Sequence, residues 1–138
     1  MRLDKPTILI VEDEPSISTL LMFTMRCAGW NPYAVANGFE AWEFLQMHRP
    51  AMTLLDWMLP DRTGFSLLLD IRRDKKLIEM PVIMLTARDA IEDRASCLER
   101  GANAYLTKPF SPHELTCKID QLLQHKYTPF SPRGMRGA

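Results

Sequence analysis

Short apolar runs alternate with amphipathic stretches along the chain. Continuous apolar residues occupy positions 7–11, 52–55 and 81–85, a pattern typical of strands that are buried on both faces of a sheet. Weaker apolar segments at 31–35 and 104–106 predict two more strands. Between the runs, apolar side chains recur at intervals of three and four residues, which predicts helices over 15–28, 38–48, 65–73, 91–100 and 112–125.

Turn and cap residues agree with these boundaries. Pro15 suits the first turn of a helix, and glycines at positions 29 and 101 suit helix ends. Ser111 followed by Pro112, with Glu114 three residues after the serine, is a capping box in register. The inward stripe of the first helix is predicted to include Ile17, Leu20, Leu21, Thr24 and Ala28.

Five strands that alternate with five helices predict an α/β domain. Because the strands are apolar rather than alternating, the sheet should be parallel, with helices covering both of its faces. We expect residues 1–125 to form one domain and residues 126–138, which contain two prolines and two glycines, to be a flexible tail or the start of a linker.

Composition excludes several classes of protein. A chain of 138 residues with 46% hydrophobic residues can form its own core, and its apolar runs are too short to span a membrane. The 17 basic and 17 acidic residues balance, so nothing favours direct binding of nucleic acid or of a membrane surface. Residues 1–6 lack the apolar segment of a signal peptide, and three widely spaced cysteines indicate reduced thiols, so we expect a cytoplasmic protein.

Polar residues stand where the predicted strands end. Glu12 and Asp13 follow the first strand, Asp56 the third, Thr86 the fourth and Lys108 the fifth. In an open parallel sheet these ends share one edge, at which ligands bind, so the five side chains should form one site. Close carboxylates repel unless a cation lies among them, and Mg2+ is the hard divalent ion that prefers oxygen ligands. A metal, an ammonium and a hydroxyl around a carboxylate suit the transfer of a phosphoryl group to that carboxylate, with Asp56 as the nucleophile.

With these residues in this order, the sequence resembles the receiver domain of bacterial two-component response regulators. The resemblance runs from about Lys5 to His125 and rests on residues 8–14 (ILIVEDE), 54–60 (LLDWMLP), 81–88 (PVIMLTAR) and 101–110 (GANAYLTKPF). It is strongest to the receivers of winged-helix transcription regulators such as the phosphate-regulon regulator. The resemblance implies a flavodoxin-like, doubly wound sheet of five strands in the order 2-1-3-4-5.

The resemblance also implies a role for each site residue. Asp56 accepts a phosphoryl group from a sensor histidine kinase or a small acyl phosphate, and the product is lost slowly, so the domain is a switch rather than a turnover enzyme. The Mg2+ ligands are Asp13, Asp56 and the backbone carbonyl of Met58, with Glu12 acting mainly through water. Around the phosphate, Thr86 turns to an oxygen, Tyr105 swings inward and Lys108 pairs with it. The Lys108–Pro109 peptide is expected to be cis.

Each of these residues also has a simpler interpretation. Acids such as Glu12 and Asp13 are common at helix N-termini, and Thr86 could cap the segment that follows it. Tyr105 on a short strand could be a packing residue, a switch or both. A phosphorylation-independent binding module on the same fold is the alternative function, although such modules usually lose a pocket residue. A phosphatase of this fold would need an acid at position 58, where the chain has Met58.

The chain departs from the winged-helix subfamily in two respects. Where that subfamily has two acids before the aromatic residue of its fifth strand, the chain has Asn103 and Ala104. Asp120 stands where a base is usual, so Lys118 should lack a partner across a symmetric dimer. We therefore expect a monomer or a weak homodimer. The second departure is the missing DNA-binding domain, since about 13 residues after His125 cannot form one, so we expect either a stand-alone receiver or a fragment. The expected output is a downstream protein or the missing effector domain.

Overall fold

The computed structural model describes residues 5–127, with side chains through Gln124. Its five strands lie within two residues of the predicted ones: β1 (Thr7–Val11), β2 (Asn31–Val35), β3 (Met52–Leu55), β4 (Val82–Thr86) and β5 (Ala104–Thr107). The helices are α1 (Pro15–Cys27), α2 (Gly38–Met47), α3 (Gly64–Arg73), α4 (Ile91–Glu99) and α5 (Pro112–Tyr127). The alternation of strand and helix predicted from the apolar pattern is confirmed.

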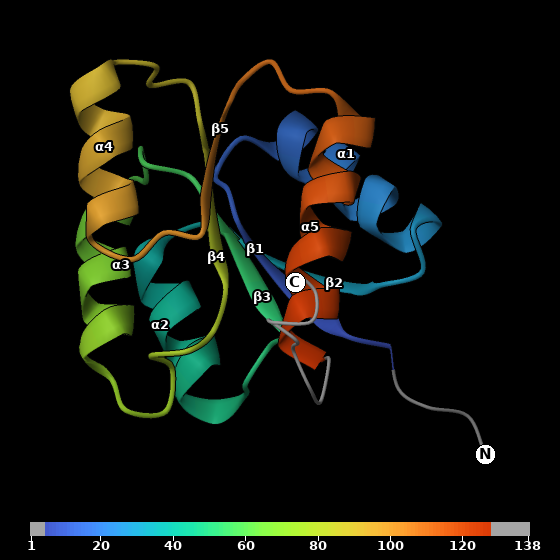
Figure 1. Ribbon diagram of the computed structural model, residues 1–138, viewed down its shortest axis with the longest axis horizontal. Helices are drawn as coiled ribbons and strands as arrows, with labels where there is room; N and C mark the ends of the chain where they lie inside the picture. Colours follow the sequence, from blue (N-terminus) through green and yellow to red (C-terminus); the bar gives the residue numbers. More distant parts are fainter. Residues whose placement is uncertain (1–4, 128–138) are drawn as a thin grey trace, which may run out of the picture.

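The five strands form one parallel sheet in the order β2-β1-β3-β4-β5. The interior strand β1 pairs with both of its neighbours, so that Ile10 lies beside Ala34 on one side and Leu54 on the other. The helix after β1 (α1) and the helix after β5 (α5) cover one face of the sheet, and α2, α3 and α4 cover the other, so the chain changes face after β2 and again after β5, as Figure 1 shows. The predicted fold and strand order are confirmed.

The sheet separates two apolar cores. Side chains alternate across a strand, so Leu9 and Val11 face α2, α3 and α4, whereas Ile8 and Ile10 face α1 and α5. All four of these side chains are at most 1% exposed. A strand with a core on each face needs apolar residues at every position, which explains the continuous apolar runs of the sequence.

The helix ends follow the predicted signals closely. Glycines with positive φ follow α1 and α4, at Gly29 (φ +92°) and Gly101 (φ +109°). The Ser111 hydroxyl accepts a hydrogen bond from the Glu114 amide at 3.2 Å, as expected of an N-cap. The last helix continues to Tyr127, two residues beyond the predicted end, and residues 128–138 lie outside the described part of the chain.

One prediction about packing on α1 is wrong. Leu20 was expected on the inward stripe, but its side chain is 44% exposed, and Met25 is fully buried in the core instead. Ala28, at the end of the same stripe, is also exposed. The reason is angular: Leu21 and Met25 are four residues apart and define the buried face, and Leu20 lies about 100° from Leu21 around the helix.

None of the described helices is long and apolar enough to cross a membrane.

Candidate functional site

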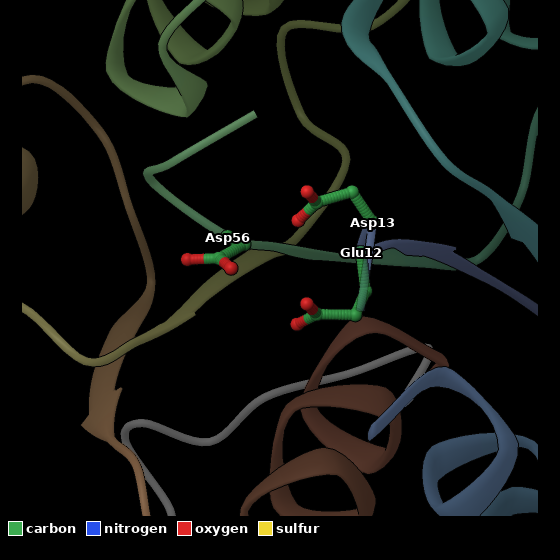
Figure 2. Close-up of side chains that lie close together, drawn as sticks. All are labelled: Glu12, Asp13 and Asp56. Atoms are coloured by element: carbon green, nitrogen blue, oxygen red, sulfur yellow. The ribbon is translucent and has the colours of Figure 1, made fainter. Parts of the chain in front are cut away.

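Three carboxylates meet at the carboxyl-terminal edge of the sheet. Glu12 and Asp13 leave the end of β1 on opposite sides, and Figure 2 shows both carboxylates turned toward Asp56 at the end of β3. One oxygen from each of the three lies within 4.8 Å of the others. Glu12 and Asp56 are only 4% and 7% exposed, whereas Asp13 is open to solvent. The prediction that strand ends bring these acids together is confirmed as geometry.

Lys108 supplies the positive charge of the site. Its Nζ donates to Glu12 Oε1 at 2.6 Å and to Asp56 Oδ2 at 2.9 Å, across 96 and 52 residues of sequence. Burial by itself lowers the pKa of Lys108, but the two hydrogen bonds and the two negative charges outweigh it and raise the pKa above its ordinary value. The lysine is therefore a permanent cation between two buried carboxylates. The peptide that follows it, Lys108–Pro109, is cis as expected.

Glu12 is the least exposed of the three clustered acids. Burial raises its pKa above the ordinary value, and the hydrogen bonds from Lys108 and from the Glu14 amide, at 3.1 Å, offset only part of that effect. Asp56 adds to the same rise through its negative charge. One ammonium beside three clustered carboxylates leaves the site with an excess of negative charge.

This donor set fits a hard divalent cation. Every candidate ligand atom in the cluster is a carboxylate oxygen, and the described residues show neither a cysteine nor a histidine in it. Mg2+ prefers oxygen ligands and retains some of its waters, which suits a cluster that is partly open through Asp13. The residues present therefore fit the magnesium ion that the sequence predicts.

The backbone after Asp56 turns back sharply and passes close to it. The Met58 amide donates to Asp56 Oδ1 at 3.3 Å, and Met58 pairs with Thr63 in an antiparallel bridge. The Gly64 amide donates to the Trp57 carbonyl at 2.7 Å. A Cβ atom at position 64 would lie 1.9 Å from the Asp56 carbonyl oxygen, so only glycine allows this approach.

Asp61, an acid of the same loop, fixes the loop to the neighbouring helix α2. Its two carboxylate oxygens accept hydrogen bonds from the Gly38 and Phe39 amides, both at 2.8 Å, at the N-terminus of α2. These bonds, the Gly38 bond foremost, lower the pKa of Asp61 below its ordinary value of 3.8. The sequence pattern does not reveal this contact, because the acid and the helix start are more than 20 residues apart.

The two residues expected to respond to phosphate both contact Arg88. Thr86 is fully buried, and its Oγ1 accepts from the Arg88 amide at 3.3 Å. Tyr105 is 2% exposed, and its hydroxyl donates to the Arg88 carbonyl at 2.7 Å. Burial raises the pKa of Tyr105 to about 12, so the hydroxyl is a permanent donor at neutral pH. Tyr105 is thus a buried packing residue that also makes a specific hydrogen bond.

The departures noted in the sequence have structural roles of their own. Asn103 Oδ1 accepts from the Val82 amide at 2.9 Å and from Arg72 Nη2 at 3.0 Å, which ties the start of β4 to α3. Ala104 is 7% exposed and belongs to the core under α1 and α5. The expectation that both positions stand for missing surface acids is therefore incomplete, since Asn103 serves an internal contact and the Ala104 side chain faces the interior.

Comparison with known proteins identifies the family. The family model for the response regulator receiver domain matches residues 8–120. The chain is 37% identical over 118 residues to the phosphate regulon transcriptional regulatory protein PhoB of Pseudomonas aeruginosa, covering 86% of this chain and 52% of that protein. It is 39% identical over 117 residues to PhoB of Escherichia coli, covering 85% and 51%. The chain spans about half the length of the curated relatives it matches.

Solved structures show the same architecture. The signal receiver domain of a signal transduction histidine kinase from Syntrophus aciditrophicus superposes with a TM-score of 0.83 at 32% identity, covering 91% of this chain and 96% of that one. The receiver domain of the sensor histidine kinase PA1611 from Pseudomonas aeruginosa PAO1, solved with a magnesium ion coordinated in its active site cleft, superposes with a TM-score of 0.76 at 35% identity, covering 88% and 96%.

The chain belongs to the response regulator receiver domain family. Within that family it is similar to the receivers of PhoB-type transcriptional regulators. It is a signalling domain of the two-component class rather than a turnover enzyme.

Proposed function

We propose that this receiver domain accepts a phosphoryl group on Asp56 and thereby controls a downstream partner. The observation that supports this most directly is the position of Asp56, whose buried carboxylate lies 2.9 Å from Lys108 Nζ at the edge where the acids converge. Three clustered carboxylates with one ammonium leave unbalanced negative charge in a partly buried position. Such an arrangement is unusual for a purely structural site.

The metal ligands in this proposal are Asp13, Asp56 and the backbone carbonyl of Met58, with Glu12 acting mainly through water. Bound Mg2+ would neutralise the excess negative charge of the acids and of an incoming phosphoryl group. Asp13 is solvent-exposed, so the site is open on the side from which an ion and its waters would enter.

The chemistry proposed for Asp56 is an in-line displacement. A carboxylate oxygen of Asp56 forms a bond to phosphorus while the bond from phosphorus to the donor breaks, and the electron pair of that bond leaves with the donor. The donor is a phosphohistidine of a sensor kinase or a small acyl phosphate, and the product is an acyl phosphate of Asp56. Lys108 stays charged throughout and pairs with a phosphoryl oxygen instead of the Asp56 carboxylate.

Thr86 provides the link from the phosphoryl group to the rest of the domain. Its hydroxyl accepts a hydrogen bond from Arg88, and among the described residues it donates to no other group. We propose that this unused proton is donated to a phosphoryl oxygen, while Tyr105 retains or strengthens its inward packing behind Thr86. The surface near Tyr105 would then report the state of Asp56 to an effector domain or partner protein.

The partners we propose follow from this chemistry. A sensor histidine kinase supplies the phosphoryl group to this domain in the cytoplasm, and the output passes to a protein or an effector domain rather than directly to nucleic acid. We also propose that the domain is a monomer or a weak homodimer, because Asp120 and Lys118 on α5 and Asn103 before β5 do not supply the charge pairs of related dimers. Sedimentation of the activated protein would measure this association.

Intact-mass measurement tests the proposed function. With Mg2+ and an acyl phosphate, the wild-type protein should gain the mass of one phosphoryl group, and Asp56→Asn should gain none. EDTA should abolish the gain, because without a cation the acids repel the incoming phosphate. The matched control is Asp120→Asn, at an exposed position of α5, and this variant should gain one phosphoryl group like the wild type. A wild-type mass that stays unchanged under saturating donor would contradict the proposal.

A further inference from the structure

Arg88 lies at the meeting point of the site, β5 and α4. Its main chain contacts both residues that are proposed to respond to phosphate, since its amide donates to Thr86 Oγ1 at 3.3 Å and its carbonyl accepts from the Tyr105 hydroxyl at 2.7 Å. A rotation of the Thr86 side chain that moves Oγ1 away from the Arg88 amide would therefore break this hydrogen bond.

The side chain of Arg88 extends in the other direction, over the residue that follows Asp56. Its guanidinium carbon lies 4.6 Å from the centroid of the Trp57 ring. Trp57 in turn stacks on Phe65 of α3, with centroids 5.2 Å apart and ring planes at 14°. The indole is held between a cation and an aromatic ring, which fixes the backbone next to Asp56.

The same guanidinium is paired with α4. Its Nε and Nη2 atoms both lie 2.9 Å from Asp93 Oδ2, in the first turn of that helix. One planar cation thus joins the acceptor loop to the helix. Because the group is rigid, it cannot leave the face of Trp57 without also disturbing its hydrogen bonds to Asp93.

We propose that Arg88 is a positioning residue that couples the acceptor loop to α4. Its guanidinium holds Trp57, and through it Asp56 and Met58, in place, and it transmits displacement of the Thr86–Arg88 hydrogen bond to Asp93. This inference rests on the proposed function of Asp56 and goes beyond it, since it assigns the connection to α4 to the side chain of one residue.

The contact of Arg88 with Trp57 is tested without any ligand. The Trp57 emission is obtained as the difference between each protein and its Trp57→Phe counterpart, which removes the signal of Trp30 and Trp42. Arg88→Ala should shift this emission to longer wavelength, because the indole loses its cover and becomes hydrated. Asp93→Asn, which breaks the ion pair but retains the guanidinium, should leave it unchanged. Arg26→Ala, on an exposed arginine of α1, is the matched control and should also leave it unchanged.

The coupling is tested with beryllofluoride, a phosphoryl mimic, and Mg2+. In the wild type, binding should change hydrogen exchange of residues 91–99. In Arg88→Ala and Asp93→Asn that change should fall by about half or more, and Arg88→Lys, which can still pair with Asp93, should restore part of it. Loss of the cation–π contact should also weaken Mg2+ binding by Arg88→Ala about two- to fivefold. Asp93→Asn should bind Mg2+ as the wild type does.

The outcomes separate the inference from the proposed function. If Arg88→Ala shows wild-type emission of Trp57 and a wild-type response of α4, the assignment of Arg88 is wrong even though Asp56 accepts the mimic. If the wild type shows no response to beryllofluoride, the proposed function fails, and the coupling assigned to Arg88 fails with it, while the ligand-free emission still decides the Trp57 contact. Asp93→Asn should keep wild-type Mg2+ binding and lose much of the α4 response. A substitution that merely destabilised the fold would weaken both.

Discussion

Two loops border the acidic site, and the molecule holds them in different ways. The loop after β3 is fixed largely by backbone groups: the Gly64 amide binds the Trp57 carbonyl, Met58 bridges to Thr63, and Asp61 binds two amides of α2. The loop after β4, residues 87–90, is exposed at every position. Among the described residues 87–90, Arg88 makes the hydrogen bonds, the ion pair and the ring contact that join this loop to Thr86, Tyr105, Asp93 and Trp57.

The difference matches the tasks proposed for the two loops. The first contributes Asp56 and the Met58 carbonyl, whose geometry must be preorganised for phosphoryl transfer. The second must change its position when Thr86 donates to a new acceptor. A loop held by one side chain and two hydrogen bonds can shift at small energetic cost, whereas a loop held by several backbone bonds cannot. The comparison therefore predicts that substitutions in the first loop mainly affect stability and metal binding. Substitutions in the second loop should mainly affect coupling, with a smaller effect on metal binding through the contact of Arg88 with Trp57.

The largest effect should come from Gly64→Ala. The added methyl group would lie 1.9 Å from the Asp56 carbonyl oxygen, so the loop has to open. We expect the free energy of unfolding to fall by about 1–3 kcal/mol or more, and Mg2+ binding to weaken with it. Chemical denaturation and a Mg2+ titration measure the two effects. Gly29→Ala is the control, because its Cβ meets nothing within 4 Å and only its positive φ is unfavourable.

Local sequence patterns predicted the strands and helices, and the ends of the predicted strands located the acidic site. The edge of a parallel sheet brought Glu12, Asp56 and Lys108 together as expected, because the end of an apolar run also marks the end of a strand. What the sequence could not show were contacts between loops far apart along the chain, such as Asp61 with α2 and Arg88 with Trp57. Such contacts depend on where folded loops lie relative to one another, which periodicity does not report.

The error at Leu20 has a simple origin. A helical stripe of three- and four-residue spacings is wider than the face that the sheet covers, so the periodicity alone could not separate exposed Leu20 from buried Met25. At positions 103 and 104 the residue types indicate lost surface charges, but they do not show that the exposed Asn103 side chain accepts hydrogen bonds from the Val82 amide and from Arg72. The type of a side chain does not show which way it points.

A smaller, pH-dependent effect should follow Asp61→Ala. Loss of the two amide contacts at α2 should cost about 1 kcal/mol at neutral pH. The pKa of Asp61 is lowered in the folded state, so its contribution is fully present above the ordinary value of 3.8 and is lost as the pH falls through the folded value. The difference in unfolding free energy between wild type and variant should therefore shrink below about pH 4.

Denaturation curves at several pH values between neutral and acidic measure this difference. Asp120→Asn, on an exposed face of α5, serves as the control for general charge effects. A difference that stays constant down to the acid limit would show that the Asp61 carboxylate does not stabilise the loop through its charge.

The smallest effect predicted here concerns the lifetime of the phosphoryl group. Hydrolysis requires a water aligned with phosphorus, and neither Met58 nor Arg88 has a carboxylate or carboxamide that would orient one. Met58→Asn should therefore speed loss of the phosphoryl group by about two- to tenfold, at most about 1.4 kcal/mol in the barrier. Time-resolved intact mass after removal of the donor measures the rate. Decay at the wild-type rate would show that water alignment at residue 58 does not limit hydrolysis.

The central claim is that Asp56, among the three clustered acids, forms the bond to phosphorus. Peptide-level mass spectrometry of wild-type protein treated with Mg2+ and an acyl phosphate tests it most directly, since fragmentation assigns the added group to one side chain. The account predicts that the phosphoryl mass resides on Asp56 and on neither Glu12 nor Asp13. A phosphoryl group found on either of those residues, or on a side chain away from the carboxyl-terminal edge of the sheet, would contradict it.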